Sequence, residues 1–123
     1  MTLHIANVTF DCANPIAVAE FWSAALRRPV ADGASRFFAT VPAGGDTAPG
    51  TPDLLFLKVP EAKTAKNRCH IDLHVASRDA VQPEVDRLVG LGATMIRPPK
   101  EEFGTYWATL QDPEGNELCL GTA

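Results

Sequence analysis

The feature that most constrains the fold of this chain is an internal repeat. Asn7 to Asn14, NVTFDCAN, aligns with His70 to Ser77, HIDLHVAS, and a helical pattern follows the first stretch closely and the second within a few residues. Further on, FFATV aligns with YWATL, and DLLFLKV aligns with the end of GNELCLG. This recurring order indicates a duplicated strand–helix–three-strand unit. We therefore predict an α+β fold of two βαβββ modules, with repeat 1 at about residues 3–60 and repeat 2 at about residues 68–123 of one domain, residues 1–123.

Hydrophobic periodicity places the elements within each repeat. We expect a first strand at Leu3–Ala13 and a helix that begins after Asn14-Pro15, where an N-cap precedes proline. The second helix is expected at about Pro83–Leu91. PKEEF, residues 99–103, is predicted to be a solvated loop. The remaining strands are predicted in SRFFATV, DLLFLKV, CHIDLHVASRDA, TMIRP, TYWATL and ELCLG, the last two joined by the turn QDPEGN.

Composition excludes several classes of partner. The net charge is −4 and the basic residues form no run longer than Arg27-Arg28, so the electrostatic footprint of a nucleic-acid-binding protein is lacking. No apolar run approaches the roughly 20 residues of a membrane helix, and the first residues do not resemble a secretory leader. Three cysteines at unpatterned spacing fit a reducing compartment. We expect a cytoplasmic protein without a nucleic-acid or membrane partner.

Polar residues share one face of the first strand in each repeat. Side chains alternate along a strand, so His70, Asp72 and His74 point to one side and their apolar neighbours to the other. A histidine beside a carboxylate is typical of general acid–base catalysis. The alternative is that these groups only hydrogen-bond to one another, as polar groups in proteins usually do. The sequence leaves both interpretations open.

Three stretches of the chain resemble the vicinal oxygen chelate superfamily, which includes glyoxalases, bleomycin-resistance proteins and dioxygenases. VTFDCANPIAVAEFW resembles the first strand and helix of that family, GLGA the end of its second helix, and DPEGNELCL its closing hairpin. The resemblance covers essentially the whole chain. It implies curved mixed sheets around a cavity, helices outside, a small-molecule ligand in the cavity and association as a homodimer.

The resemblance also implies where a metal would bind. Metal-dependent members use one residue from the first strand of each half, usually histidine, and one from the last strand of each half, usually glutamate. These positions fall on Asn7, Leu57, His70 and Cys119, of which only His70 keeps the usual type. A divalent ion needs several converging donors, so we predict a degenerate site that disfavours a metal and leaves the cofactor open. Zinc shared by His70, Cys119 and His74 is disfavoured because two residues along a strand span about 6.6 Å.

The same resemblance assigns the polar strand faces to the lining of the cavity. Aromatic residues on the central strands, where alternation sends one of each adjacent pair inward, add a wall suited to a planar ligand. We predict catalytic roles for His70, Asp72 and His74, with His70 as the one candidate metal ligand. Predicted ligand-binding residues are Asn7, Thr9, Asp11, Phe38, Leu57, Trp107 and Cys119.

Two functions follow from these expectations. The first is an isomerase-, lyase- or dioxygenase-type enzyme that acts on a small oxygenated organic molecule. The alternative is a metal-free protein that binds a small molecule or an antibiotic, as bleomycin-resistance proteins do. A bare interaction module is least favoured, since it has no need of an inward polar face.

Overall fold

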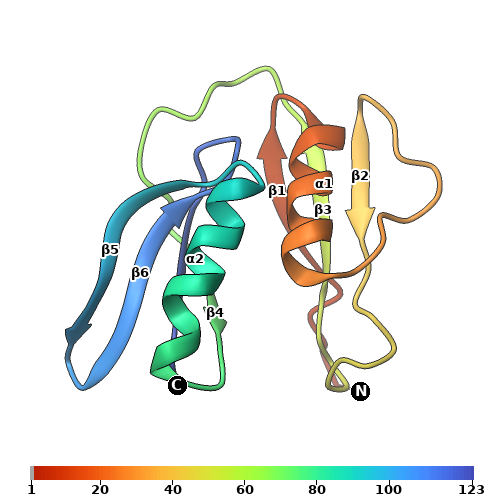
Figure 1. The fold of residues 1–123 in the computed structure, drawn as a ribbon. Helices are drawn as coiled ribbons and strands as arrows, with labels where there is room; N and C mark the ends of the chain where they lie inside the picture. The colour runs from red at the N-terminus through yellow and green to blue at the C-terminus, as the bar shows by residue number, and fades with distance from the viewer. Residues whose placement is uncertain (1) are drawn as a thin grey trace. The chain divides into compact units, whose positions relative to one another are not determined.

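The structure is a computed structural model that describes residues 2–123, and the chain divides into two compact units, Met1–Lys63 and Thr64–Ala123 (Figure 1). The boundary falls within the polar stretch PEAKTAKN. Each unit has its own sheet and its own long helix, as the predicted duplication requires. No helix in residues 2–123 has the length and apolar character needed to cross a membrane.

The first unit contains a mixed sheet of three strands in the order β1-β3-β2. Strand β1 runs parallel to β3, and β2 runs antiparallel to β3. Helix α1 packs against β2 and β3 (Figure 1). The bounds are β1 Asn7–Cys12, α1 Pro15–Leu26, β2 Phe38–Val41 and β3 Asp53–Lys58.

Helix α1 begins where the sequence predicts. The Asn14 side-chain oxygen accepts a hydrogen bond from the Ala17 amide at 3.2 Å, and Pro15 occupies the first turn, where no amide partner is needed. The buried face of the helix includes Trp22, and the Phe10 ring stacks against both Trp22 and Phe56, with centroids 5.7 and 5.2 Å apart. This aromatic stack is part of the core of the first unit.

The first unit departs from the predicted βαβββ order, because its described residues form three strands and not four. The segment between α1 and β2 contains Pro29 and Gly33, whose φ of 92° suits a turn rather than a strand. A backbone hydrogen bond from the Ala31 amide to the Thr40 carbonyl, at 2.9 Å, connects this segment to β2. Strand β1 is also shorter than predicted, since Leu3 is 98% exposed and gains nothing from a pleated surface.

The second unit has the complete predicted order, with a short 3₁₀ turn before its helix. Its sheet runs β4-β7-β6-β5, with β4 parallel to β7 and the other pairs antiparallel. Val81, Val85 and Leu88 of α2 are buried, and α2 packs against β5, β6 and β7. The bounds are β4 Ile71–His74, η1 Arg78–Ala80, α2 Val81–Gly90, β5 Thr94–Glu102, β6 Thr105–Gln111 and β7 Glu117–Gly121.

The expectation that PKEEF is a loop is wrong. Strand β5 continues to Glu102, where Lys100, Glu101 and Glu102 pair with Trp107, Tyr106 and Thr105 of β6. Proline is tolerated in this segment because β5 is an edge strand, so one side of its backbone has no ladder to complete. The turn to β6 follows at Phe103 and Gly104, which both have positive φ.

Candidate functional site

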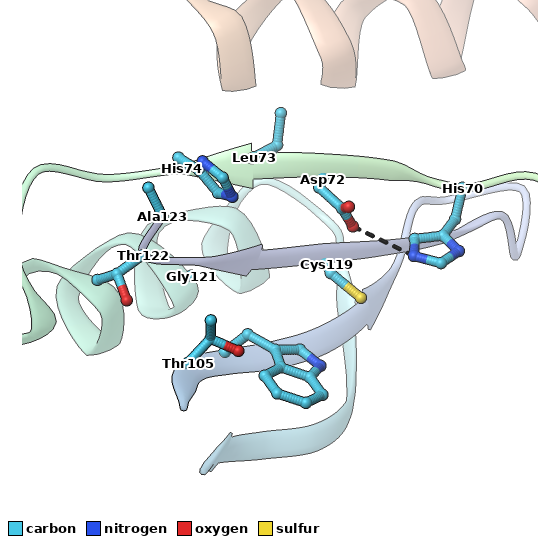
Figure 2. Close-up of a pocket in the computed structure, with 10 residues that line it drawn as sticks. His70, Asp72, Leu73, His74, Thr105, Cys119, Gly121, Thr122 and Ala123 are labelled. Carbon is cyan, nitrogen blue, oxygen red and sulfur yellow. Dashed lines mark ion pairs between the residues drawn. The ribbon is translucent and has the colours of Figure 1, made fainter. Parts of the chain in front are cut away.

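The second unit contains a pocket of about 470 Å³ (Figure 2). It opens on the face of the sheet away from the buried residues Leu118, Leu120 and Ala108, because the strand residues between these positions supply its lining. The residues that line it are His70, Asp72, Leu73, His74, Thr105, Trp107, Cys119, Gly121, Thr122 and Ala123.

The pocket brings together the three polar residues predicted from the first strand of repeat 2. Asp72 and His74 lie on the exposed face of β4, whereas Ile71 and Leu73 are half-buried. His70 lies directly before the strand and also lines the pocket. The shared face of Asp72 and His74 follows from the alternation of side chains along β4, and His70 reaches the same pocket from the residue before the strand.

His70 and Asp72 are in direct contact at the pocket. His70 Nε2 lies 3.1 Å from Asp72 Oδ1, drawn as the dashed line in Figure 2, with 41% and 62% of the two side chains exposed. At such exposure the pair adds little to folding stability, so its effect is to orient the imidazole. When Nε2 donates to Asp72, the neutral ring presents Nδ1 as an acceptor for a substrate proton.

Cys119 comes from β7, the neighbour of β4. It pairs in register with Asp72 on one side and with Thr109 on the other, and its sulfur lies 3.7 Å from the Thr109 hydroxyl. One donor atom each of His70, Asp72 and Cys119 lie within 4.8 Å of one another. Figure 2 shows Cys119 on β7, the strand beside the one that carries Asp72.

Trp107 forms a flat wall of the pocket and is held by Arg97. The Arg97 guanidinium carbon lies 4.3 Å from the centre of the indole ring, a cation–π contact. Arg97 is itself held by Glu102, with Nη2 to Oε2 at 2.7 Å, and it donates to the Trp107 carbonyl at 3.4 Å. Arg97 is not among the residues that line the pocket.

Gly121 allows β6 and β7 to approach closely beside the pocket. A Cβ at this position would collide with the Tyr106 carbonyl oxygen and lie 2.6 Å from Trp107 Cβ. Thr105, Gly121, Thr122 and Ala123 were not predicted as lining, and neither was Leu73, which the alternation along the strand placed on the opposite face. A glycine near the end of a strand does signal close backbone approach, and that signal could have identified Gly121.

A buried carboxylate positions the chain before His70. Glu117 is buried, and its Oε1 accepts a hydrogen bond from the Asn67 amide at 2.7 Å, while the Asn67 side chain donates to the Glu117 carbonyl at 3.2 Å. The turn before β7 is closed by Asp112, whose Oδ1 accepts from the Asn116 amide at 3.0 Å. These contacts connect the segment that carries His70 to the strand that carries Cys119.

The remaining predicted residues belong to the first unit. Asn7, Thr9 and Asp11 lie on the exposed side of β1, and Leu57 pairs in register with Asp11 and with Phe38. Leu57 and Phe38 are 42% and 45% exposed. These residues share one surface of their own sheet, whereas the pocket is lined by the second unit.

Phe37 and Phe38 are adjacent aromatic residues of the predicted strand SRFFATV, and 58% of Phe37 and 45% of Phe38 are exposed. Phe37 precedes β2, so the alternation of a strand does not apply to it. The Arg36 guanidinium carbon lies 4.8 Å from the centre of the Phe37 ring, a cation–π contact.

Residues 7–121 match the glyoxalase-like domain family. This match covers nearly the whole chain. The chain belongs to the glyoxalase-like domain family. The predicted vicinal oxygen chelate superfamily and the α+β class with mixed sheets and two helices are thereby confirmed. The sequence has no significant match among proteins of curated function.

Solved structures resemble this glyoxalase-like domain along its whole length. A glyoxalase/bleomycin resistance protein/dioxygenase family enzyme from Burkholderia phytofirmans PsJN has a TM-score of 0.81 at 19% identity, covering 98% of each chain. A glyoxalase-related enzyme from Fulvimarina pelagi has a TM-score of 0.78 at 18% identity, covering 99% of this chain and 89% of that one. The oxidase ChaP-H2 has a TM-score of 0.67 at 20% identity, covering 100% and 95%. At these identities the likeness shows the fold.

The residues of this glyoxalase-like domain do not fit the metal arrangement that the superfamily resemblance implies. Of the four corresponding positions, Leu57 has no donor atom in its side chain, and Asn7 offers only an amide. His70 and Cys119 supply nitrogen and sulfur, whereas magnesium and manganese prefer oxygen ligands. The donors that do lie together in the second unit are His70, Asp72 and Cys119.

Proposed function

We propose that this glyoxalase-like protein is an enzyme of the isomerase, lyase or dioxygenase type, with a degenerate metal site, that acts on a small oxygenated organic molecule in the pocket. The observation that supports this proposal most directly is the 3.1 Å contact between His70 Nε2 and Asp72 Oδ1 at the pocket. A carboxylate that orients an imidazole beside a small-molecule pocket is an arrangement suited to moving a proton.

The proposed chemistry is proton transfer at carbon next to a carbonyl group. His70 Nδ1 removes the proton, and Asp72 stabilises the imidazolium that forms, because their contact becomes a full ion pair at that moment. His74 lies farther along the same face and offers a second group that can donate or accept a proton. Trp107 supplies a flat apolar surface against which the carbon skeleton packs.

Exchange of substrate hydrogen for deuterium provides the test. Small 2-oxo and 2-hydroxy carbonyl compounds are incubated with the protein in D₂O, and the loss of the C–H signal is followed by NMR. We expect His70→Gln to slow exchange by about 100-fold or more, the usual contribution of a general base. His4→Gln, at an exposed position before β1, is the matched control and should leave exchange unchanged. Equal rates for the two variants would contradict the proposed role of His70.

The alternative function is metal-free binding of a planar small molecule or antibiotic. The Trp107 side chain, which lines the pocket and makes a cation–π contact with Arg97, supports it. A ligand present at 100 times its dissociation constant should stabilise the fold by about 2.7 kcal/mol, which a thermal-shift screen detects. Ligands that stabilise the wild type and His70→Gln equally, without proton exchange in either, would favour this function over the enzyme.

Two finer expectations also stay proposals. The first is association of two chains as a homodimer, which size-exclusion chromatography with light scattering would test. The second is a cytoplasmic location, consistent with three cysteines that form no disulfide within residues 2–123.

A further inference from the structure

We propose that Arg97 is a positioning residue for ligand binding. It fixes the orientation of the Trp107 indole, which lines the pocket, although Arg97 itself does not line it. Glu102 in turn fixes Arg97, through the 2.7 Å contact between Arg97 Nη2 and Glu102 Oε2. This role rests on the proposed function only in that a ligand packs against Trp107, and it applies to the enzyme and to the binding protein alike.

An irregularity in the ladder between β5 and β6 brings Arg97 and Glu102 to the same side of the sheet as Trp107. Arg97 and Glu102 are five positions apart, but the β6 residues that pair with them, Thr109 and Thr105, are four apart. Strand β5 therefore accommodates one extra residue there, as in a β-bulge. Without it, two residues five positions apart would point to opposite faces. With it, both side chains lie on the face of β6 that carries Trp107.

Arg97 contacts both the ring and the backbone of Trp107. Its guanidinium carbon lies 4.3 Å from the centre of the indole, and its Nη1 donates to the Trp107 carbonyl oxygen at 3.4 Å. The contact with Glu102 uses the other terminal nitrogen, Nη2. A planar guanidinium with several N–H donors can stack on a ring and pair with a carboxylate at the same time. These three contacts restrict the torsions that the indole can adopt.

The pair of Arg97 and Glu102 acts locally and not on the stability of the whole unit. The two side chains are 26% and 38% exposed, and an ion pair at such exposure adds little to folding stability. Without Arg97 the indole would sample other rotamers, and a ligand would have to order it on binding. Ordering one side chain weakens binding by about 2- to 10-fold. KM should rise by this factor with kcat unchanged, because His70 and Asp72 are not altered.

The first experiment measures the motion of the indole in the full chain without a ligand. The two tryptophans, Trp22 and Trp107, are labelled with ¹⁵N, and NMR relaxation gives the order parameter of each indole N–H. We expect the Trp107 value to fall from about 0.85, typical of a rigid group, to below about 0.6 in Arg97→Gln. Buried Trp22 should stay rigid. A mobile Trp107 indole in the wild type, or a rigid one in Arg97→Gln, would overturn the proposal.

Arg78 provides the matched control. Its guanidinium carbon lies 4.5 Å from the centre of the Tyr106 ring, and its Nη2 lies 2.9 Å from Glu101 Oε1, but Tyr106 does not line the pocket. Arg78→Gln therefore removes the same charge and the same kinds of contact on the same hairpin. It should leave the Trp107 indole rigid and KM unchanged. An equal loss of order at Trp107 in both variants would contradict a specific role of Arg97.

The second experiment measures KM for deuterium exchange of a small 2-oxo carbonyl compound. Arg97→Gln should raise KM in the wild-type background, but not further in a Trp107→Ala background, where the indole that it positions is gone. An unchanged KM in the first case, or an equal rise in both, would overturn the role in ligand binding. Absence of exchange in the wild type would instead reject the proposed enzyme, and the order parameters would then decide the role of Arg97 alone.

Discussion

At the scale of single residues, the pocket depends on positions where one additional atom would cause a steric clash. Gly121 has no Cβ, and its backbone lies against Tyr106 and Trp107 of the neighbouring strand. His70, Asp72 and Cys119 were recognisable in the sequence, because the alternation of side chains and the family resemblance both indicated them. Glu117 was not, since its partner Asn67 is 50 residues away and no local pattern connects them.

Gly121→Ala should destabilise the protein by about 1 to 3 kcal/mol, the usual cost of overpacking. The new methyl group would lie 2.6 Å from Trp107 Cβ and collide with the Tyr106 carbonyl, and a strand backbone cannot move aside easily. Urea denaturation measures the change. Gly90→Ala is the control: nothing lies within 4 Å of its added Cβ, so it should be neutral or slightly stabilising. Equal effects of the two substitutions would contradict this explanation.

At the scale of elements, strand and helix ends explain both the successes and the errors of the predictions. The start of α1 was predicted correctly because Asn14 and Pro15 carry a local capping signal. The length of β5 was missed because proline usually interrupts strands, and the sequence does not reveal that β5 lies at the edge of its sheet. In the first unit, a loop between α1 and β2 takes the place of the fourth strand that the βαβββ order predicts. The polarity of its residues does not distinguish a loop from a strand.

Asn14→Ala should reduce the free energy of unfolding by about 1 kcal/mol. The substitution removes the side-chain oxygen that accepts the Ala17 amide, leaving that donor without its cap. Asn14→Asp keeps an acceptor at the same place and should retain most of the stability. Thermal and chemical denaturation of the two variants measure the difference, and a loss in Asn14→Asp as large as in Asn14→Ala would argue against capping.

The contact between Glu117 and Asn67 should connect β7 to the segment before β4. Glu117→Ala should cost about 1 to 3 kcal/mol, because it leaves the Asn67 amide without its acceptor. Amide hydrogen exchange is the specific readout: the Asn67 amide should exchange faster in the variant. Unchanged protection of Asn67 would mean that Glu117 stabilises β7 by another route.

At the scale of the whole molecule, the duplicated plan and the family were accessible from sequence, whereas the pocket's full lining was not. Both units contain a helix packed on a mixed sheet, and in each a strand precedes the helix. The pocket also uses Thr105 and Thr122. Those residues approach His74 only through the pairing of three strands, which no single stretch of sequence encodes.

The three cysteines should report this organisation in a single labelling experiment. Cys69 is exposed, Cys119 is half-buried and Cys12 is buried. We expect rapid modification of Cys69 by a thiol reagent, slower modification of Cys119, and modification of Cys12 only on unfolding. Mass spectrometry of digested protein assigns each site, and early labelling of Cys12 would contradict the described core of the first unit.

The parallel pairing of β4 with β7 has a consequence for folding. Strand β4 does not pair with the strand that follows it in sequence, so its partner must wait until α2 and the β5–β6 hairpin have formed the surface on which β7 lies. Closing such a long loop is slow, which favours late docking of β4. Substitutions on β4 should then accelerate unfolding while leaving the folding rate nearly unchanged. The pocket would be the last part of its unit to assemble and the first to open.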